Sequence, residues 1–367
     1  MLRLITGFLI LVLALAGCGD VSVDPIRIGF ISGMTGRFAD FGLPGRNGAL
    51  LAVEQRNQTG GIEGRPIELL IRDDAQESEV AIKAVQELLG LQIEALIGPM
   101  TSGMVKVILP VTEPAGLVVI SPTSAAVELS GKDDLFFRLA STMRESMHLS
   151  AALHYRRGLR RIAVAYDINN RVFSESTLEE FRTAFGELGG EVPMAKSFDS
   201  AKPPVFSDLI QELLSAQPDA LLFISSAVDT VLLAQQARKL SPGLPLIATE
   251  WAATEQLIEL GGHAVEGLYL GQLFDRNNIS SRYQSFRDAY QIRFQQEPGY
   301  TSVMGYEAAS VLLDALSRRA KGQPLKEVLL RGSFEGLQQT IVFDRFGDSQ
   351  RRIFTTVIRN GQFVVIE

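Results

Sequence analysis

The sequence predicts an α/β protein built as two doubly wound lobes, each a parallel sheet with helices on both faces. Short apolar runs bounded by turn residues, such as 95–97 and 117–120, are typical of buried parallel strands joined by crossover helices. Four or five strands with intervening helices are complete by residue 140, and the same pattern begins again after Ser141. Two βα series of similar size indicate two lobes within 367 residues rather than one oversized sheet.

The first 17 residues are typical of a bacterial signal peptide and belong to neither lobe. Arg3 gives a positive start, and the apolar run over 4–16 is shorter than a comfortable membrane span. The run ends in the letters LAGC at 15–18, which look like a lipobox. We therefore expect cleavage after residue 17, lipidation of Cys18 and a short linker over 18–25. An uncleaved helical anchor is the alternative.

The cysteine count and the net charge exclude several kinds of site. Cys18 is the only cysteine, so the exported chain forms neither an internal disulfide nor a multi-thiolate metal site. Without residues 1–17 the chain keeps 34 of its 35 basic residues and all 42 acidic ones, a net charge of −8. This mild acidity argues against a nucleic-acid partner.

The first lobe is predicted in order along the chain. It opens with a strand, a glycine-containing segment and a helix, and it continues with a second strand that ends in two aspartates. Another helix then leads into the two apolar runs described above, and a short fifth strand closes the series. The predicted elements are strand 26–31, the helix around 49–53, strand 67–71, the helix over 80–88, strands 95–97 and 117–120, and strand 135–138.

The second lobe repeats this order and is followed by a mostly helical stretch. Gln323-Pro324 separates the last two helices, and Asn360-Gly361 is a strong hairpin signal between the two closing strands. The predicted elements are helix 147–155, strand 161–167, the helix after Ser174, a strand near Met194, helix 209–214, strand 220–224, a helix ending near 240, strand 246–249, helices within 279–331, and strands 354–358 and 363–366.

Hydroxyl side chains follow two neighbouring strands of the first lobe. Thr101 and Ser102 come after the run at 95–97, and Thr123 and Ser124 come after the run at 117–120. Ligands of open α/β sheets bind at the carboxyl ends of the strands, where helices begin with free N–H groups. The pattern therefore indicates a receiver for a small anion such as a carboxylate. The alternative is that these residues only cap helices.

Residues that would support catalysis or metal binding are missing or badly spaced. Asp73 and Asp74 sit together at a strand end with no histidine nearby in the sequence, which favours a structural role. His148 and His154 are six residues apart and lie on different faces of a helix. The chain has no G-x-S-x-G elbow, and its glycine-rich segment at 42–48 lacks the dinucleotide-binding spacing. We therefore expect no enzyme, no cofactor and no metal.

The order of these motifs resembles the periplasmic binding proteins of the leucine/isoleucine/valine type. The resemblance rests on IRIGFISGMTGRFADFG, NQTGGIEGRPIELLIRDDAQ, EALIGPMTSG, LVVISPTSA, RRIAVAYD, PDALLFISS and FDRFGD, and it spans roughly residues 26–364. It implies a type I periplasmic binding protein, whose two lobes are joined by a three-segment hinge. The crossings are expected near 140–142, 270–274 and 340–346. The lobes are then 26–141 plus 273–343 and 142–272 plus 344–367.

The resemblance also assigns roles to residues at the expected cleft. Ser102 matches the serine that holds a ligand carboxylate, and the backbone carbonyl of Thr123 matches an acceptor for the ligand ammonium. Glu250 matches an acidic residue that pairs with this ammonium from the second lobe. Phe41 and Phe173 match aromatic residues that line the side-chain pocket. On their own, Glu250 could equally be a surface acid at a helix start, and the two aromatics could be core residues.

Two positions depart from the family pattern. Amino-acid binders of this family usually carry a threonine where this chain has Ala125, and an aromatic where it has Ser226. Ser124 could supply the missing hydroxyl. These departures weaken the assignment of a standard aliphatic amino acid as the ligand.

The resemblance implies a lipid-anchored extracytoplasmic receptor that feeds an ABC importer. We expect a monomer that binds an amino acid, or a related small carboxylate or amide, by hinge closure and then docks on a membrane permease. The expected location is the periplasmic side of a bacterial membrane or the cell surface. A receptor that reports ligand occupancy to a membrane signalling system is the main alternative, and a hydrolase on the same fold has no supporting residues.

Overall fold

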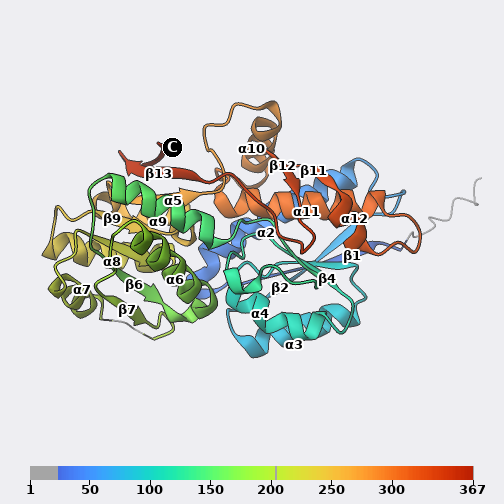
Figure 1. Ribbon diagram of the computed structural model, residues 1–367. Coiled ribbons are helices and arrows are strands. Elements are labelled where there is room, and N and C mark those ends of the chain that lie inside the picture. The colour runs from blue at the N-terminus through green and yellow to red at the C-terminus, as the bar shows by residue number, and fades with distance from the viewer. Residues whose placement is uncertain (1–23, 203–204, 367) are drawn as a thin grey trace, which may run out of the picture.

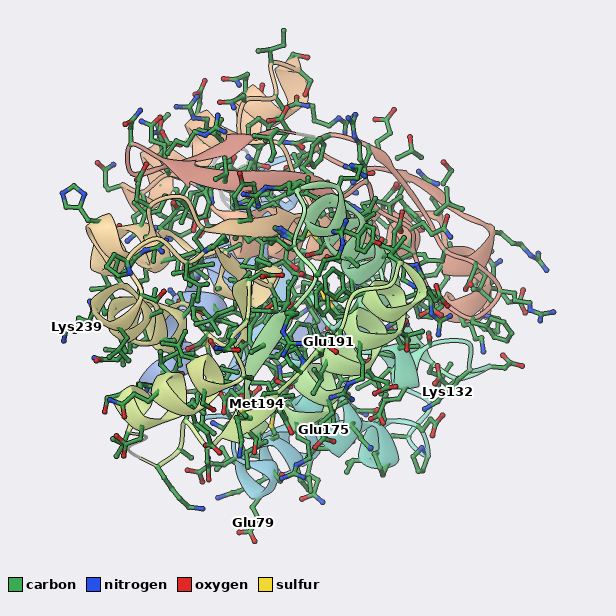
Figure 2. The ribbon with its side chains drawn as sticks, turned by 60° about the vertical axis from the view of Figure 1, so that its left-hand side comes forward. Glu79, Lys132, Glu175, Glu191, Met194 and Lys239 are labelled. Atoms are coloured by element: carbon green, nitrogen blue, oxygen red, sulfur yellow. The ribbon has the colours of Figure 1, made fainter. Side chains whose placement is uncertain are left out.

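Two α/β lobes lie side by side in the computed structural model, which describes residues 24–202 and 205–366 (Figure 1). The predicted signal peptide and Cys18 lie outside the described residues. Among the helices that are described, none is long and apolar enough to cross a membrane. Charged side chains such as Glu79 and Lys239 point outward from the lobe surfaces (Figure 2).

The first lobe is built on a five-stranded parallel sheet. Its central strands are short, apolar and fully buried, as expected for strands covered by helices on both faces. The strand order is β2 (Ile67–Asp73), β1 (Ile26–Ser32), β3 (Ala95–Ile97), β4 (Val118–Ser121) and β5 (Phe136–Arg138).

Helices cover both faces of this sheet. Residues of α3 and α4 form one apolar cluster with the sheet, and residues of α2, α11 and α12 contribute to a larger cluster on the other face. A small antiparallel ribbon of β11 and β12 follows them. The elements are η1 (Gly36–Phe38), α2 (Ala39–Gln58), α3 (Ser78–Gly90), α4 (Ser102–Thr112), η2 (Val127–Leu129), α10 (Ser281–Phe294), α11 (Tyr300–Arg318), α12 (Leu325–Arg331), β11 (Ser333–Glu335) and β12 (Thr340–Val342).

Helix α2 begins earlier than the sequence predicts. We expected the helix around 49–53 to follow a glycine-containing segment that includes residues 41–45, but these residues already belong to the first turns of α2. Gly48 of this helix serves close packing against α11 instead. A Cβ atom on Gly48 would lie only 2.0 Å from the backbone oxygen of Ser302. The absence of a side chain therefore lets the two helices approach each other.

The second lobe is built on a seven-stranded sheet. Five strands are parallel, and the C-terminal hairpin predicted at Asn360-Gly361 adds two antiparallel strands to one edge. The strand order is β14 (Gln362–Val365), β13 (Phe354–Arg359), β10 (Tyr269–Gln272), β9 (Leu246–Ala248), β8 (Ala220–Ile224), β6 (Ile162–Asp167) and β7 (Ala195–Phe198).

Helices again cover both faces of this sheet. Side chains of α7, α8 and α9 pack with the sheet in one cluster, and those of α5 and α6 pack in the cluster that extends into the first lobe. The elements are α5 (Met143–Arg156), η3 (Ile168–Asn170), α6 (Arg171–Glu187), α7 (Phe206–Ser215), α8 (Ala227–Leu240), η4 (Glu250–Ala252), α9 (Glu255–Gly261) and η5 (Gly262–Val265).

The two lobes share one strand order. The order β2-β1-β3-β4-β5 of the first lobe corresponds to β7-β6-β8-β9-β10 of the second lobe. Each order reverses beside the lobe's first strand, β1 or β6, which is where ligands of such sheets bind. The prediction of two similar doubly wound lobes is therefore confirmed.

Three chain segments connect the lobes, at 139–142, 273–280 and 343–353. The last segment stays with the first lobe for longer than we expected. Arg138 donates from its backbone N–H to the Gly347 carbonyl at 3.1 Å, and its Nε donates to Asp348 Oδ1 at 2.7 Å. We therefore propose that the chain re-enters the second lobe after about residue 349 rather than at 344.

Candidate functional site

A small cavity lies between the lobes. The first lobe contributes residues that follow β3 and β4 and residues at the starts of α2 and α11, and the second lobe contributes residues that follow β6 and β9. The cavity therefore sits at the strand ends where both lobes reverse their strand order. The lining residues are Phe41, Met100, Thr101, Ser102, Thr123, Asn170, Phe173, Glu250, Trp251 and Tyr300.

Ser102 is held at the cavity by the turn between β3 and α4. Gly98 starts this turn with a φ of +95°, and a Cβ atom there would lie 2.0 Å from the Ile31 carbonyl oxygen, so the turn requires glycine. The Ser102 hydroxyl oxygen accepts hydrogen bonds from the backbone N–H groups of Ala125 and Ala126, both at 3.2 Å. Since its oxygen acts as an acceptor, its own O–H is available to donate into the cavity.

Thr101 and Thr123 also line the cavity, but their hydroxyl groups donate within the first lobe. Thr101 Oγ1 donates to Gln76 Oε1 at 2.9 Å, and Thr123 Oγ1 donates to the Met100 carbonyl at 2.5 Å. The Thr101 side chain makes no capping hydrogen bond to α4. The Thr101 side chain therefore leaves the N–H groups in the first turn of α4 uncapped.

Ser124 and Ala125 do not line the cavity. The Ser124 hydroxyl donates to Ser102 Oγ at 3.0 Å and is buried behind it. Ser124 thus supports Ser102 rather than replacing the hydroxyl that the family carries in place of Ala125.

Glu250 enters the cavity from the second lobe, directly after β9. Its side chain is buried, and the Ser146 hydroxyl donates to it at a long 3.4 Å. Burial raises the pKa of the Glu250 carboxyl from 4.5 to about 7. No lysine, arginine or histidine is among the described residues that line the cavity. Glu250 is therefore a buried carboxyl that faces a cavity without a cationic side chain.

Aromatic rings form much of the remaining wall. Phe41 packs against Tyr300 with ring centres 6.1 Å apart, and Phe173 packs edge-on against Trp251 at 5.7 Å. Phe38 of the first lobe stacks on Trp251 of the second lobe at 5.8 Å. Phe41 and Phe173 are thus both core residues and lining residues, so the two interpretations from the sequence do not exclude each other.

Ser226 lies outside the cavity lining. It is the N-cap of α8, where its hydroxyl accepts from the Asp229 N–H at 3.3 Å and donates to Asp229 Oδ2 at 2.8 Å. The position that is aromatic in family members therefore caps a helix in this protein.

The cavity has four lining residues that the sequence analysis did not select, Met100, Asn170, Trp251 and Tyr300. Trp251 follows Glu250 directly, so its position beside the acid was a usable signal. Tyr300 starts α11, more than 150 residues away in the chain from most of the other first-lobe lining residues, and only the fold brings it to the site.

Direct contacts between the lobes close the cleft around the cavity. Arg37 of η1 forms an ion pair with Asp229 of α8. Thr254 Oγ1 donates to Asp40 Oδ2 at 2.7 Å, and the Gly103 N–H donates to Asn170 Oδ1 at 3.0 Å. The structure is therefore the closed arrangement of the two lobes. In the described ranges, no cluster of three or more metal-ligating side chains is present.

Comparisons with known proteins agree with this architecture. A family model described as periplasmic binding protein matches residues 25–356. A leucine-, isoleucine-, valine-, threonine- and alanine-binding protein of Pseudomonas aeruginosa is 24% identical over 353 residues, which are 94% of this chain and 92% of the relative.

Solved structures are similar over nearly the whole chain. A leucine-binding protein from Thermotoga maritima superposes with a TM-score of 0.85 at 26% identity and covers 93% of this chain and 98% of its own. A solute-binding protein of an ABC transporter from R. palustris, in complex with benzoate, has the same TM-score of 0.85 at 18% identity, with 93% and 95% covered. The predicted type I fold is confirmed. Together with the family match over residues 25–356, these similarities show that the chain belongs to the periplasmic binding protein family, as its resemblance to the leucine/isoleucine/valine type predicted.

Proposed function

We propose that the protein is the extracytoplasmic solute receptor of an ABC importer and that it traps an amino acid, or a related small carboxylate or amide, between its lobes. The observation that carries this proposal is the polarity of the cavity. The first lobe contributes the start of α4 and the Ser102 hydroxyl to the lining, and the second lobe contributes the Glu250 carboxyl.

The α4 end suits a carboxylate. The N-terminus of a helix carries a partial positive charge and N–H groups that point outward, and hydrogen bonds to an ionised acceptor are stronger than neutral ones. The Ser102 hydroxyl is oriented by the N–H groups that donate to its oxygen, so it can donate to the same carboxylate.

The Glu250 end suits an ammonium group. A buried carboxylate without a cation is costly, and the pKa of about 7 reflects this cost. A ligand ammonium would supply the missing partner, and the backbone carbonyl of Thr123 would be a second acceptor for it. Because Ser102 and Glu250 come from different lobes, one zwitterion would contact both and would stabilise the closed arrangement.

The sequence and the relatives support the remaining parts of the proposal. Cys18 would anchor the exported chain to lipid, and the permease would be the membrane partner of a monomeric receptor. We propose no catalytic role for the cavity, since the chain belongs to a family of solute-binding proteins.

A thermal-shift screen tests this proposal. Amino acids, amides and small organic acids, including benzoate, are added singly to the purified protein. A ligand that binds only the folded state raises the melting temperature. The proposal expects at least one α-amino acid or related amide to raise it more than the matching acid without the amine does. A response confined to acids that lack an amine would contradict the role given to Glu250.

A further inference from the structure

The only tryptophan of the chain has a hydrogen-bond donor that no atom of the described residues satisfies. Trp251 lines the cavity and is 4% exposed, and its Nε1–H group is buried without a partner among the described residues. Its ring is held on two sides, by the stacked Phe38 and by the edge-on Phe173. The indole is therefore fixed in place, and an unpaired N–H at such a site favours an acceptor that arrives with the ligand.

Asn170 adds a second donor to the same wall. Its Oδ1 accepts from the Gly103 N–H at 3.0 Å, so the group that remains on this side chain is the NH₂ donor. The proposed head-group contacts use Ser102, Glu250 and the Thr123 carbonyl. The hydroxyl protons of Thr101 and Thr123 are already donated within the first lobe. The lining groups left for the rest of the ligand are thus the two N–H donors, the Tyr300 hydroxyl, and aromatic or thioether surface.

The charge of the lining residues favours an uncharged acceptor on the ligand. The described lining residues include one acid, Glu250, and no base. A second carboxylate on the ligand would be buried near Glu250 without a cation, which is unfavourable. A neutral oxygen, as in an amide, a hydroxyl or a carbonyl, satisfies a donor without adding charge.

We infer that the side chain of the ligand carries a neutral oxygen acceptor that binds Trp251 Nε1–H, so that the cavity prefers polar uncharged amino acids to their aliphatic isosteres. This inference rests on the proposed function, because it assumes that an amino-acid head group occupies the Ser102 and Glu250 ends.

Pairs of amino acids with similar shape test the inference. Calorimetry measures the dissociation constants of threonine against valine, asparagine against leucine, and glutamine against methionine. We expect the acceptor-bearing member of the best-binding pair to bind about tenfold more tightly to the wild type. In Trp251→Phe, which keeps an aromatic ring but removes the N–H, this preference should disappear. Phe38→Leu is the matched control, since it disturbs the same stack and leaves the N–H, so both members should weaken alike.

Nuclear magnetic resonance gives a second measurement that needs no variant. With one tryptophan in the chain, the ¹⁵N-labelled protein has a single indole N–H signal. The acceptor-bearing ligand should shift this proton downfield, and the isostere should not. Aliphatic members that bind as tightly as their polar isosteres, or an indole signal that moves equally with both, would overturn the inference while leaving the amino-acid receptor intact. If none of the six amino acids binds, the inference is overturned, whereas the proposed function is decided by the wider thermal-shift screen.

Discussion

Replacing Glu250 with glutamine should raise the free energy of unfolding of the ligand-free protein and lower its affinity for an amino-acid ligand. The carboxyl ionises at pH 4.5 in an unfolded chain and near pH 7 in the folded protein, because burial disfavours its charged form. Each pH unit between these values corresponds to about 1.4 kcal/mol, so at pH 8 the ionised carboxylate lowers the free energy of unfolding by about 3 kcal/mol. Below pH 4.5 the group is protonated in both states and this contribution is absent. Glu250→Gln should therefore raise the free energy of unfolding by about 3 kcal/mol at pH 8 and change it little at pH 4.

The same substitution should weaken the binding of a ligand that carries an ammonium group. Removing one partner of a buried charged pair costs roughly 2–5 kcal/mol, which corresponds to about a 30-fold loss of affinity or more. A ligand that lacks the amine makes no such pair, so its affinity should be unchanged.

Urea unfolding at the two pH values, followed by circular dichroism, measures the stability of the variant without ligand. Calorimetry with an amino acid and its des-amino analogue measures binding. Glu145→Gln, at an exposed position on α5, is the control for loss of a carboxylate and should change neither quantity. A Glu250→Gln variant that binds the amino acid as tightly as the wild type would refute the pairing with an ammonium, and a plain acid or amide would become the better ligand.

Three further predictions concern pH, closure and packing. The dissociation constant for an amino acid should rise by up to about tenfold per pH unit as the pH falls below 7, because binding then requires Glu250 to lose a proton. Calorimetry across pH 5–8 measures this dependence, and a dissociation constant that does not change with pH would argue against it. Arg37→Ala removes the ion pair to α8 across the cleft, so scattering should show a larger radius of gyration without ligand, and the ligand affinity should fall about threefold to fivefold. The control Arg171→Ala breaks an ion pair within α6 and should change neither quantity. Gly48→Ala places a Cβ atom 2.0 Å from a carbonyl oxygen of α11, so urea unfolding should show a free energy of unfolding that is lower by about 1–3 kcal/mol. In the control Gly186→Ala the added Cβ atom has no neighbour within 4 Å, so the free energy of unfolding should not fall.

Much of the fold could be predicted because its parallel strands are buried on both faces. Runs such as 95–97 and 220–224 are wholly apolar and end at turn residues, so the strand pattern is visible without any tertiary information. The predicted start of α2 was wrong because its local sequence does not resemble a helix. Glycine and Pro44 are typical of a turn, and only close tertiary contacts, such as that of Gly48 with helix α11, explain why glycines occur inside this helix.

The candidate site was predictable only in part. Six of the nine selected residues line the cavity, because residues that follow strand ends in both lobes meet there, although their roles in binding stay predictions. Ser124, Ala125 and Ser226 lie outside the lining. A buried hydroxyl that supports a neighbour, like that of Ser124, or caps a helix, like that of Ser226, has the same sequence context as one that faces a ligand. Tyr300 depends on long-range packing, which strand and helix periodicity does not encode, whereas Asn170 follows the strand β6 and carries the same strand-end signal as the selected residues.

A crystal structure of the protein with the amino acid that raises its melting temperature most would test the central claim most directly. The claim predicts one ligand molecule in the cavity between the lobes. Its carboxylate should accept from the hydroxyl and the backbone N–H of Ser102 at the start of α4, and its ammonium should lie within hydrogen-bond distance of the Glu250 carboxylate. A ligand bound elsewhere, or one in the cavity whose amine makes no contact with Glu250, would contradict it.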